Sequence, residues 1–223
     1  MPFIDRVDAG RKLAAALARF RKEDPVILAL VRGGLVVAAE IASAFQAPLD
    51  IVLVRKIGVP CEPELAMGAV VDGRDPVVVR NEAVIRAARV SKAEFEIVVA
   101  RELGEIDRRR DAYLRDRERV DLRGRNIIVV DDGIATGATT RAVLSSLRQR
   151  GARKLVLAIP VAPKELLDEM TADADEIVCL EAVTDFGGVG AFYQDFHQVS
   201  DDEVEAILDK YLPRGPSSHT SGE

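Results

Sequence analysis

Two neighbouring carboxylates follow a run of apolar residues in the middle of the chain, in the segment 127–140, IIVVDDGIATGATT. Asp131 and Asp132 stand at the end of a predicted buried strand, and open α/β sheets bind their ligands at the carboxyl ends of the strands. Carboxylate oxygens accept hydrogen bonds from hydroxyl groups. The acid pair therefore suits a ligand that carries hydroxyls.

The residues after the acid pair have the composition of an anion site. They are small or carry a hydroxyl, and they lead into a predicted helix. A helix start offers unpaired backbone N–H groups and the positive end of the helix dipole, and small side chains let a phosphate approach closely. A ligand that carries a phosphate at one end and two neighbouring hydroxyls a short distance away is a ribose 5-phosphate. The predicted substrate-binding residues of this loop are Gly133, Ala135, Thr136, Gly137, Ala138, Thr139 and Thr140.

The segment also has a plainer interpretation. It could be a plain strand-to-helix turn in which an aspartate caps the helix and glycine provides flexibility. It is not a Walker A loop, because no Gly-Lys-Ser/Thr end is present, and no GxGxxG fingerprint follows a strand.

The segment resembles the signature of the type I phosphoribosyltransferases, in which four apolar residues precede two acidic ones and a TGxT loop follows. Here these are residues 127–130, Asp131 and Asp132, and then Thr136, Gly137 and Thr139. The resemblance implies transfer of the 5-phosphoribosyl group of 5-phosphoribosyl 1-diphosphate (PRPP) to a nitrogenous base, with release of diphosphate. It also implies Mg²⁺ as cofactor, bound with the diphosphate of PRPP, and we expect no separate metal site made by protein residues.

In this family a second loop, after the first core strand, binds diphosphate through backbone amides. Arg32, Gly33 and Gly34 occupy that place, and we expect a cis peptide near Arg32–Gly33. After the next strand come Arg55 and Lys56, whose charges suit a diphosphate leaving group. A simple glycine turn and a solvated basic pair are the alternatives. The resemblance implies catalytic roles for Arg32, Lys56, Asp131 and Asp132, and substrate contacts for Gly33, Gly34 and Arg55.

The chain is more narrowly similar to bacterial phosphoribosyltransferase-like proteins whose base substrate is not established, through "RKIG…PELAMGAV", "VGAFYQDFHQVSDDEV" and the N-terminal "FIDRVDAGRKLA". The 6-oxopurine enzymes carry an aspartate where this chain has Ala135, which disfavours hypoxanthine and guanine as substrates. Five of the ten aromatic residues follow Leu180. Phe186 is the first candidate to contact the base, although any of the five could instead belong to a small satellite core.

Apolar runs and helical periodicities alternate along the chain, which predicts an α/β fold with a doubly wound, mostly parallel sheet and flanking helices. We expect a first helix capped by Asp8 and a long helix from a capping box at Ser91 and Glu94. The predicted strands span 25–31, 48–58, 125–132, 154–162 and 175–183, with an edge hairpin at 66–80; the predicted helices span 7–20, 34–45, 91–120, 138–151 and 164–170.

The predicted organisation is one phosphoribosyltransferase-like domain over residues 1–212. Within it, residues 57–120 form an insertion that acts as a flexible flap, and residues 181–212 form a small C-terminal hood for the base. Residues 213–223, rich in Pro, Gly and Ser, are expected to be disordered. The charged helix of the insertion could be a solvated face, part of a lid or a dimer contact.

Composition limits the remaining possibilities. The net charge of −6 argues against a nucleic-acid-binding protein, and no apolar run is long enough for a membrane span. Cys61 and Cys179 form no CxxC pair, which suggests free thiols in a reducing compartment. We therefore expect a cytoplasmic homodimer that binds PRPP and a small base. A PRPP- or nucleotide-sensing regulatory protein without catalysis is the main alternative, and a phosphate-ester hydrolase is a weaker one.

Overall fold

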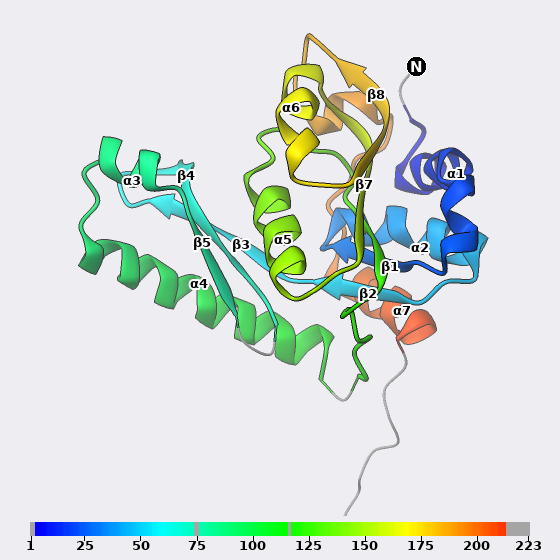
Figure 1. The fold of residues 1–223 in the computed structure, drawn as a ribbon, viewed down its shortest axis with the longest axis horizontal. Helices are drawn as coiled ribbons and strands as arrows, with labels where there is room; N and C mark the ends of the chain where they lie inside the picture. The colour runs from blue at the N-terminus through cyan, green and yellow to red at the C-terminus, as the bar shows by residue number, and fades with distance from the viewer. Residues whose placement is uncertain (1–2, 74–75, 116, 213–223) are drawn as a thin grey trace, which may run out of the picture.

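The computed structural model describes residues 3–73, 76–115 and 117–212. Its centre is a sheet of five parallel strands in the order β2-β1-β6-β7-β8 (Figure 1). The inner strands are continuous apolar runs because a parallel sheet is covered on both faces. The strands are β1 (Val26–Leu30), β2 (Leu49–Val52), β6 (Asn126–Val130), β7 (Lys154–Pro163) and β8 (Glu176–Val183).

Helices cover both faces of this sheet, so the predicted doubly wound architecture is confirmed. Successive side chains of a strand point to opposite faces. In β6, Ile128 and Val130 pack in the core on the side of α1, α2 and α7, whereas Ile127 and Val129 pack on the side of α5 and α6. The helices are α1 (Arg6–Ala16), α2 (Gly33–Phe45), α5 (Ala138–Gln149), α6 (Lys164–Glu169) and α7 (Asp201–Tyr211).

A second, antiparallel sheet of order β3-β4-β5 projects to one side of the main sheet, with α4 running along it (Figure 1). The predicted hairpin is confirmed, because β4 pairs with β5 in antiparallel register. The single predicted strand over 48–58 is wrong: the chain passes from β2 into β3 at Leu53, and the two strands belong to different sheets. The elements of this part are β3 (Val54–Val59), β4 (Glu62–Val71), β5 (Val77–Arg80), α3 (Glu82–Ala87) and α4 (Lys92–Tyr113).

The helix ends test the capping predictions. The Ser91–Glu94 capping box is confirmed, although α4 ends at Tyr113 and not near 120. The Asp8 cap is wrong. Asp5 is the N-cap of α1 and accepts a hydrogen bond from the amide of Asp8, whose own carboxylate accepts from Lys12 one turn later. Short 3₁₀ helices complete the fold: η1 (Ala18–Glu23), η2 (Met170–Ala172) and η3 (Val189–Phe192).

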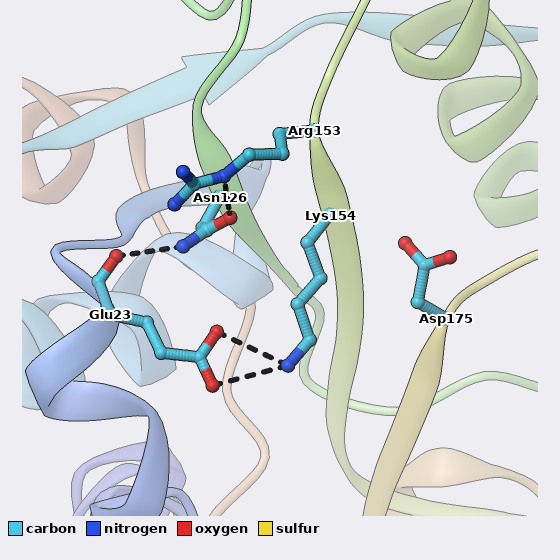
Figure 2. A pocket seen from close by; sticks show the side chains of 5 residues that line it. All are labelled: Glu23, Asn126, Arg153, Lys154 and Asp175. Atoms are coloured by element: carbon cyan, nitrogen blue, oxygen red, sulfur yellow. Dashed lines mark hydrogen bonds and ion pairs between the residues drawn. The ribbon is translucent and has the colours of Figure 1, made fainter.

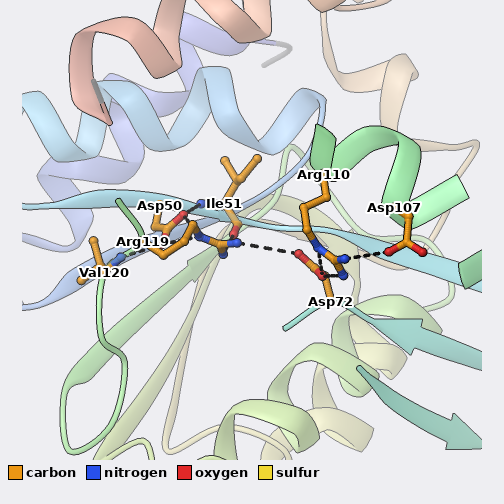
Figure 3. A network of polar contacts seen from close by, with 7 residues as sticks. All are labelled: Asp50, Ile51, Asp72, Asp107, Arg110, Arg119 and Val120. Carbon is orange, nitrogen blue, oxygen red and sulfur yellow. Dashed lines mark hydrogen bonds and ion pairs between the residues drawn. The ribbon is translucent and has the colours of Figure 1, made fainter. Parts of the chain in front are cut away.

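A network of buried carboxylates and arginines ties the small sheet to the main sheet (Figure 3). Asp50 of β2 accepts two hydrogen bonds from Arg119 Nε, at 2.8 and 2.9 Å. Asp72, at the end of β4, accepts from Arg110 of α4 and lies 3.7 Å from the Arg119 guanidinium. The chain leaves the main sheet and returns to it at this network. The network therefore fixes both ends of the segment that carries the small sheet and α4.

Two smaller predictions can be checked here. Cys61 and Cys179 are both free thiols. None of the helices in the described ranges combines the length and apolar character that crossing a bilayer requires. The predicted disordered tail, 213–223, lies outside the described residues.

Candidate functional site

The order of the main sheet marks one place for a ligand. From β1 the chain runs through α2 to β2 on one side, and from β6 it runs through α5 to β7 on the other side. Ligands of doubly wound sheets bind outside the carboxyl ends of the strands where the winding reverses. That point lies between β1 and β6. The predicted loops there run from Arg32 into the first turn of α2 at Gly33 and Gly34, and from Asp131 to the first residue of α5, Ala138. The fold thus brings the two predicted loops together.

These loops pack directly against each other at their glycines. A Cβ on Gly33 would overlap Oδ2 of Asp132 and lie 2.6 Å from its Cγ. A Cβ on Gly34 would lie 2.7 Å from the carbonyl oxygen of Val130. The sequence suggested that these glycines admit an anion. The structure gives them a further role, because only glycine permits this contact between the loops. The peptide between Val31 and Arg32 is cis, one bond before the predicted position.

Asp132 is held by two residues that the sequence analysis missed. Arg6 Nε donates to Asp132 Oδ2 at 2.8 Å, and Arg6 Nη1 donates to the carbonyl oxygen of His197 at 2.8 Å. The hydroxyl of Tyr193 donates to the backbone carbonyl of Asp132 at 2.6 Å. Arg6 and Tyr193 come from opposite ends of the chain, so no local spacing could have indicated them. For Arg6, the similarity of the N-terminal stretch FIDRVDAGRKLA to the bacterial group was the available signal.

The two aspartates differ in their surroundings. Asp131 Oδ1 accepts a hydrogen bond from the amide of Asp132 at 2.9 Å. Burial of Asp131, together with the adjacent charge of Asp132, raises its pKa well above the usual value. Burial likewise raises the pKa of the Tyr193 hydroxyl, which therefore acts as a hydrogen-bond donor.

The predicted phosphate loop runs from the acid pair into α5. Gly137, at φ +69°, is the N-cap residue of this helix, and Ala138 and Thr139 lie in its first turn. Ala135 and Thr136 are exposed. Thr140 is fully buried, and its hydroxyl has no hydrogen-bond partner within the described ranges. The exposed part of the loop thus ends at the start of the helix, where unpaired N–H groups are available.

The predicted cations make other contacts. Arg55 Nε donates to Glu102 of α4 at 2.9 Å, and Lys56 Nζ donates to Glu64 of β4 at 2.9 Å. Arg32 Nη1 lies 3.4 Å from Asp201, at the start of α7. Each of the three therefore has an acidic partner outside the acid pair. Their roles toward diphosphate stay predictions.

Four of the five aromatic residues after Leu180 divide into two groups. Tyr193 is buried against Phe3, and Tyr211 donates to a backbone carbonyl of α2, so both are structural. Phe186 stacks on Phe192 with a centroid distance of 5.8 Å, and both remain partly exposed. Val189 lies in the same segment as Phe186, and a Cβ on Gly133 of the acid-pair loop would lie 2.6 Å from the side chain of Val189. The segment with Phe186 therefore adjoins the loop of the acid pair.

Residues 4–197 match the family model described as phosphoribosyl transferase domain. The chain belongs to this family. It is 47% identical over 208 residues to the Mycobacterium tuberculosis protein named "Putative phosphoribosyl transferase Rv0571c". The match covers 93% of this chain and 46% of that protein, so the chain spans about half the length of the curated relatives it matches. The Thermus thermophilus protein TT1426 has the same fold, at 43% identity and a TM-score of 0.82, covering 95% of this chain and 99% of that one.

The acid pair of this phosphoribosyl transferase domain fits a divalent cation that arrives with its substrate. No group of three or more His, Cys, Asp or Glu side chains that could hold a metal occurs in the described ranges. Mg²⁺, however, is usually bound through one or two carboxylates together with substrate phosphates. Arg6 contacts the carboxylate of Asp132, whereas the carboxylate of Asp131 accepts from a backbone amide. Asp131 and Asp132 are the residues that would hold such a cation.

Two cavities lie outside the switch point. One, of about 500 Å³, lies at the opposite edge of the sheet, where β6 and β7 begin (Figure 2). Its Lys154 and Glu23 are paired with each other, and Arg153 donates to Asn126 at 2.9 Å. The second, of about 450 Å³, lies between β4, β5 and α5 and reaches Ala138. The first is on the wrong edge for a sheet ligand, and the second adjoins the predicted phosphate loop.

Proposed function

We propose that this domain transfers the 5-phosphoribosyl group of PRPP to a nitrogenous base and releases diphosphate. The observation that carries the proposal is the meeting of two loops at the switch point of the sheet. One loop holds Asp131 and Asp132 before the start of α5, and the other holds Gly33 and Gly34 after β1. A ribosyl phosphate that carries a second anionic group suits this site, because its hydroxyls can meet the acid pair and its two anionic groups can meet the backbone amides of the two loops.

Each part of the site has a separate task in this proposal. The helix start at Gly137 and Ala138 receives the 5-phosphate through its backbone N–H groups. Asp131 and Asp132 accept hydrogen bonds from the ribose hydroxyls. The loop at Gly33 and Gly34 offers amides to the diphosphate. Positioning and charge stabilisation supply most of the rate in such a reaction. Mg²⁺, when bound with PRPP, neutralises charge on the departing diphosphate.

The acceptor base is proposed to lie beside the stacked pair Phe186 and Phe192. Ala135 gives the base neither a hydrogen-bond donor nor an acceptor. One hydrogen bond to a charged group contributes about 1.5–3 kcal/mol, or roughly a ten- to hundredfold difference in binding. Hypoxanthine and guanine are therefore expected to be poor substrates, as is any base that needs a carboxylate at that position.

The test is release of diphosphate from PRPP and Mg²⁺ in the presence of a panel of purine, pyrimidine and other nitrogenous bases. Release that depends on a base establishes the transferase, and the preferred base tests the role of Ala135. Hypoxanthine or guanine as the best substrate would refute that role and leave the transferase assignment intact. Size-exclusion chromatography with light scattering on the same sample tests the expected homodimer.

The alternative of a PRPP- or nucleotide-sensing regulatory protein rests on the predicted basic pair. Arg55 and Lys56 were expected to hold a leaving diphosphate, yet Glu102 and Glu64 pair with them. A sensor does not need free cations at that position. Calorimetry together with the diphosphate assay separates the two functions: a sensor binds PRPP or a nucleotide tightly but releases no diphosphate with any base of the panel.

A further inference from the structure

Arg6 is a buried arginine that connects three parts of the chain at the acid pair. It is the first residue of α1 and is 7% exposed. Its guanidinium donates to Asp132 at 2.8 Å and to the carbonyl of His197 at 2.8 Å, and it lies 4.0 Å from the ring centroid of Phe196. The guanidinium therefore links the N-terminal helix, the loop after β6 and the C-terminal segment.

This contact commits one oxygen of Asp132. Oδ2 lies 2.8 Å from Arg6 Nε and is so close to Gly33 that a Cβ there would overlap it. That oxygen is therefore taken up by contacts with the protein. The side chain of Asp132 is 15% exposed. The rotamer of Asp132, and so the direction of Oδ1, depends on Arg6.

The aromatic ring of Phe196 covers one face of the guanidinium, and Tyr193 of the same segment donates to the backbone carbonyl of Asp132. A guanidinium is planar and holds its donors in a fixed fork, so it can orient a carboxylate while it stacks on a ring. Lysine could supply the charge but neither the fork nor the stacking surface. An arginine is therefore the residue that this arrangement requires.

We propose that Arg6 is a positioning residue for the phosphoribosyl site: it fixes the Asp132 carboxylate for the ribose hydroxyls and connects the C-terminal segment to that subsite. This inference rests on the proposed function. It assigns to the N-terminal helix a role in substrate binding beyond its packing against α2. The segment 193–197 thus reaches Asp132 by two routes, through the side chain of Arg6 and through the hydroxyl of Tyr193.

The test compares PRPP binding by calorimetry, with Mg²⁺ present, in the wild type and in Arg6→Gln, Arg6→Lys, Asp132→Asn and the double variant Arg6→Gln/Asp132→Asn. Arg6→Gln is expected to weaken binding by about ten- to a hundredfold, and Arg6→Lys to restore part of the loss. Because Arg6 acts through Asp132, the double variant should bind no more weakly than Asp132→Asn alone. The matched control is Arg11→Gln, an exposed arginine of the same helix paired with Glu40, which should leave binding unchanged.

Thermal unfolding of every variant separates positioning from simple stabilisation. The inference would be overturned if Arg6→Gln or Arg6→Lys folds and binds PRPP as tightly as the wild type does. It would also be overturned if the losses of PRPP affinity in Arg6→Gln and Asp132→Asn add up in the double variant. Absence of PRPP binding by the wild type would instead overturn the proposed function. Without ligand, the side-chain carboxyl ¹³C resonance of Asp132 should move in Arg6→Gln and stay in place in Arg11→Gln; an unmoved resonance would contradict the contact itself.

Discussion

The carboxylate of Asp132 lies against the α-carbon of Gly33, so closely that the two loops of the candidate site have no room for a side chain between them. Gly33→Ala must therefore displace the Asp132 carboxylate from Arg6. We expect a loss of about 1–3 kcal/mol in the free energy of unfolding, the usual cost of overpacking, together with weaker PRPP binding. Urea denaturation and calorimetry measure the two effects.

Gly104 provides the matched control for that substitution. It lies inside α4, and a Cβ there would meet nothing within 4 Å. Gly104→Ala should raise the free energy of unfolding by about 0.5–1 kcal/mol, since alanine is the better helix former, and should leave PRPP binding unchanged. If Gly33→Ala were as harmless as Gly104→Ala, the tight contact between the loops would be wrong.

The phosphate loop is better tested at Thr136 than at its glycine. Gly137 has φ +69°, and a Cβ there would lie 3.0 Å from Leu166, so a larger residue would disturb the fold as well as the ligand. Thr136→Val removes only an exposed hydroxyl. We expect ribose 5-phosphate to bind about ten- to a hundredfold more weakly, the effect of one hydrogen bond to a charged group.

Calorimetry with ribose 5-phosphate measures this loss. Ser145→Ala is the control, because it removes an exposed hydroxyl two turns further along α5. Equal affinity in Thr136→Val and the wild type would remove Thr136 from the site, whereas equal losses in both variants would point to a general effect on the helix.

The network around Asp72 should govern how firmly the insertion is attached. Asp72 is 3% exposed and accepts from Arg110 Nε at 3.0 Å (Figure 3). Asp72→Asn should cost about 1.5–3 kcal/mol, the contribution of a hydrogen bond to a charged group, and should speed amide exchange in α4. Asp107→Asn is the control, because this exposed partner of the same arginine should cost less than about 1 kcal/mol. Hydrogen exchange that stays unchanged in α4 would mean that other contacts hold the insertion.

The contacts of His197 predict a dependence of stability on pH. Its imidazole lies 3.0 Å from Glu203 and 3.2 Å from Asp195, and these carboxylates raise its pKa above 6.5. A raised pKa in the folded state adds stability that is fully present below pH 6.5 and is lost as the pH rises through the folded-state value. His197→Asn should thus lower the melting temperature at acidic pH and have little effect at alkaline pH. A difference that is equal at every pH would contradict this ion pairing.

Local patterns in the sequence determined much of the fold. Continuous apolar runs identified β1, β6 and β7, and the capping box at Ser91 and Glu94 marked the start of α4. The acid pair and the Gly/Thr loop after it pointed to the carboxyl edge of the sheet, where the structure has them. These features depend on neighbouring residues and on periods of 2 or 3.6 residues, which a sequence displays directly.

Tertiary structure alone decided the partners of those residues. Arg6 reaches Asp132 across 126 positions, and Tyr193 reaches it across 61. The division of residues 48–58 between two sheets likewise follows from the pairing of β3 with β4, which the apolar run itself does not encode. Contacts at such separations arise from the packing of whole elements, because a side chain finds its partner only after the helices and strands that carry both have come together.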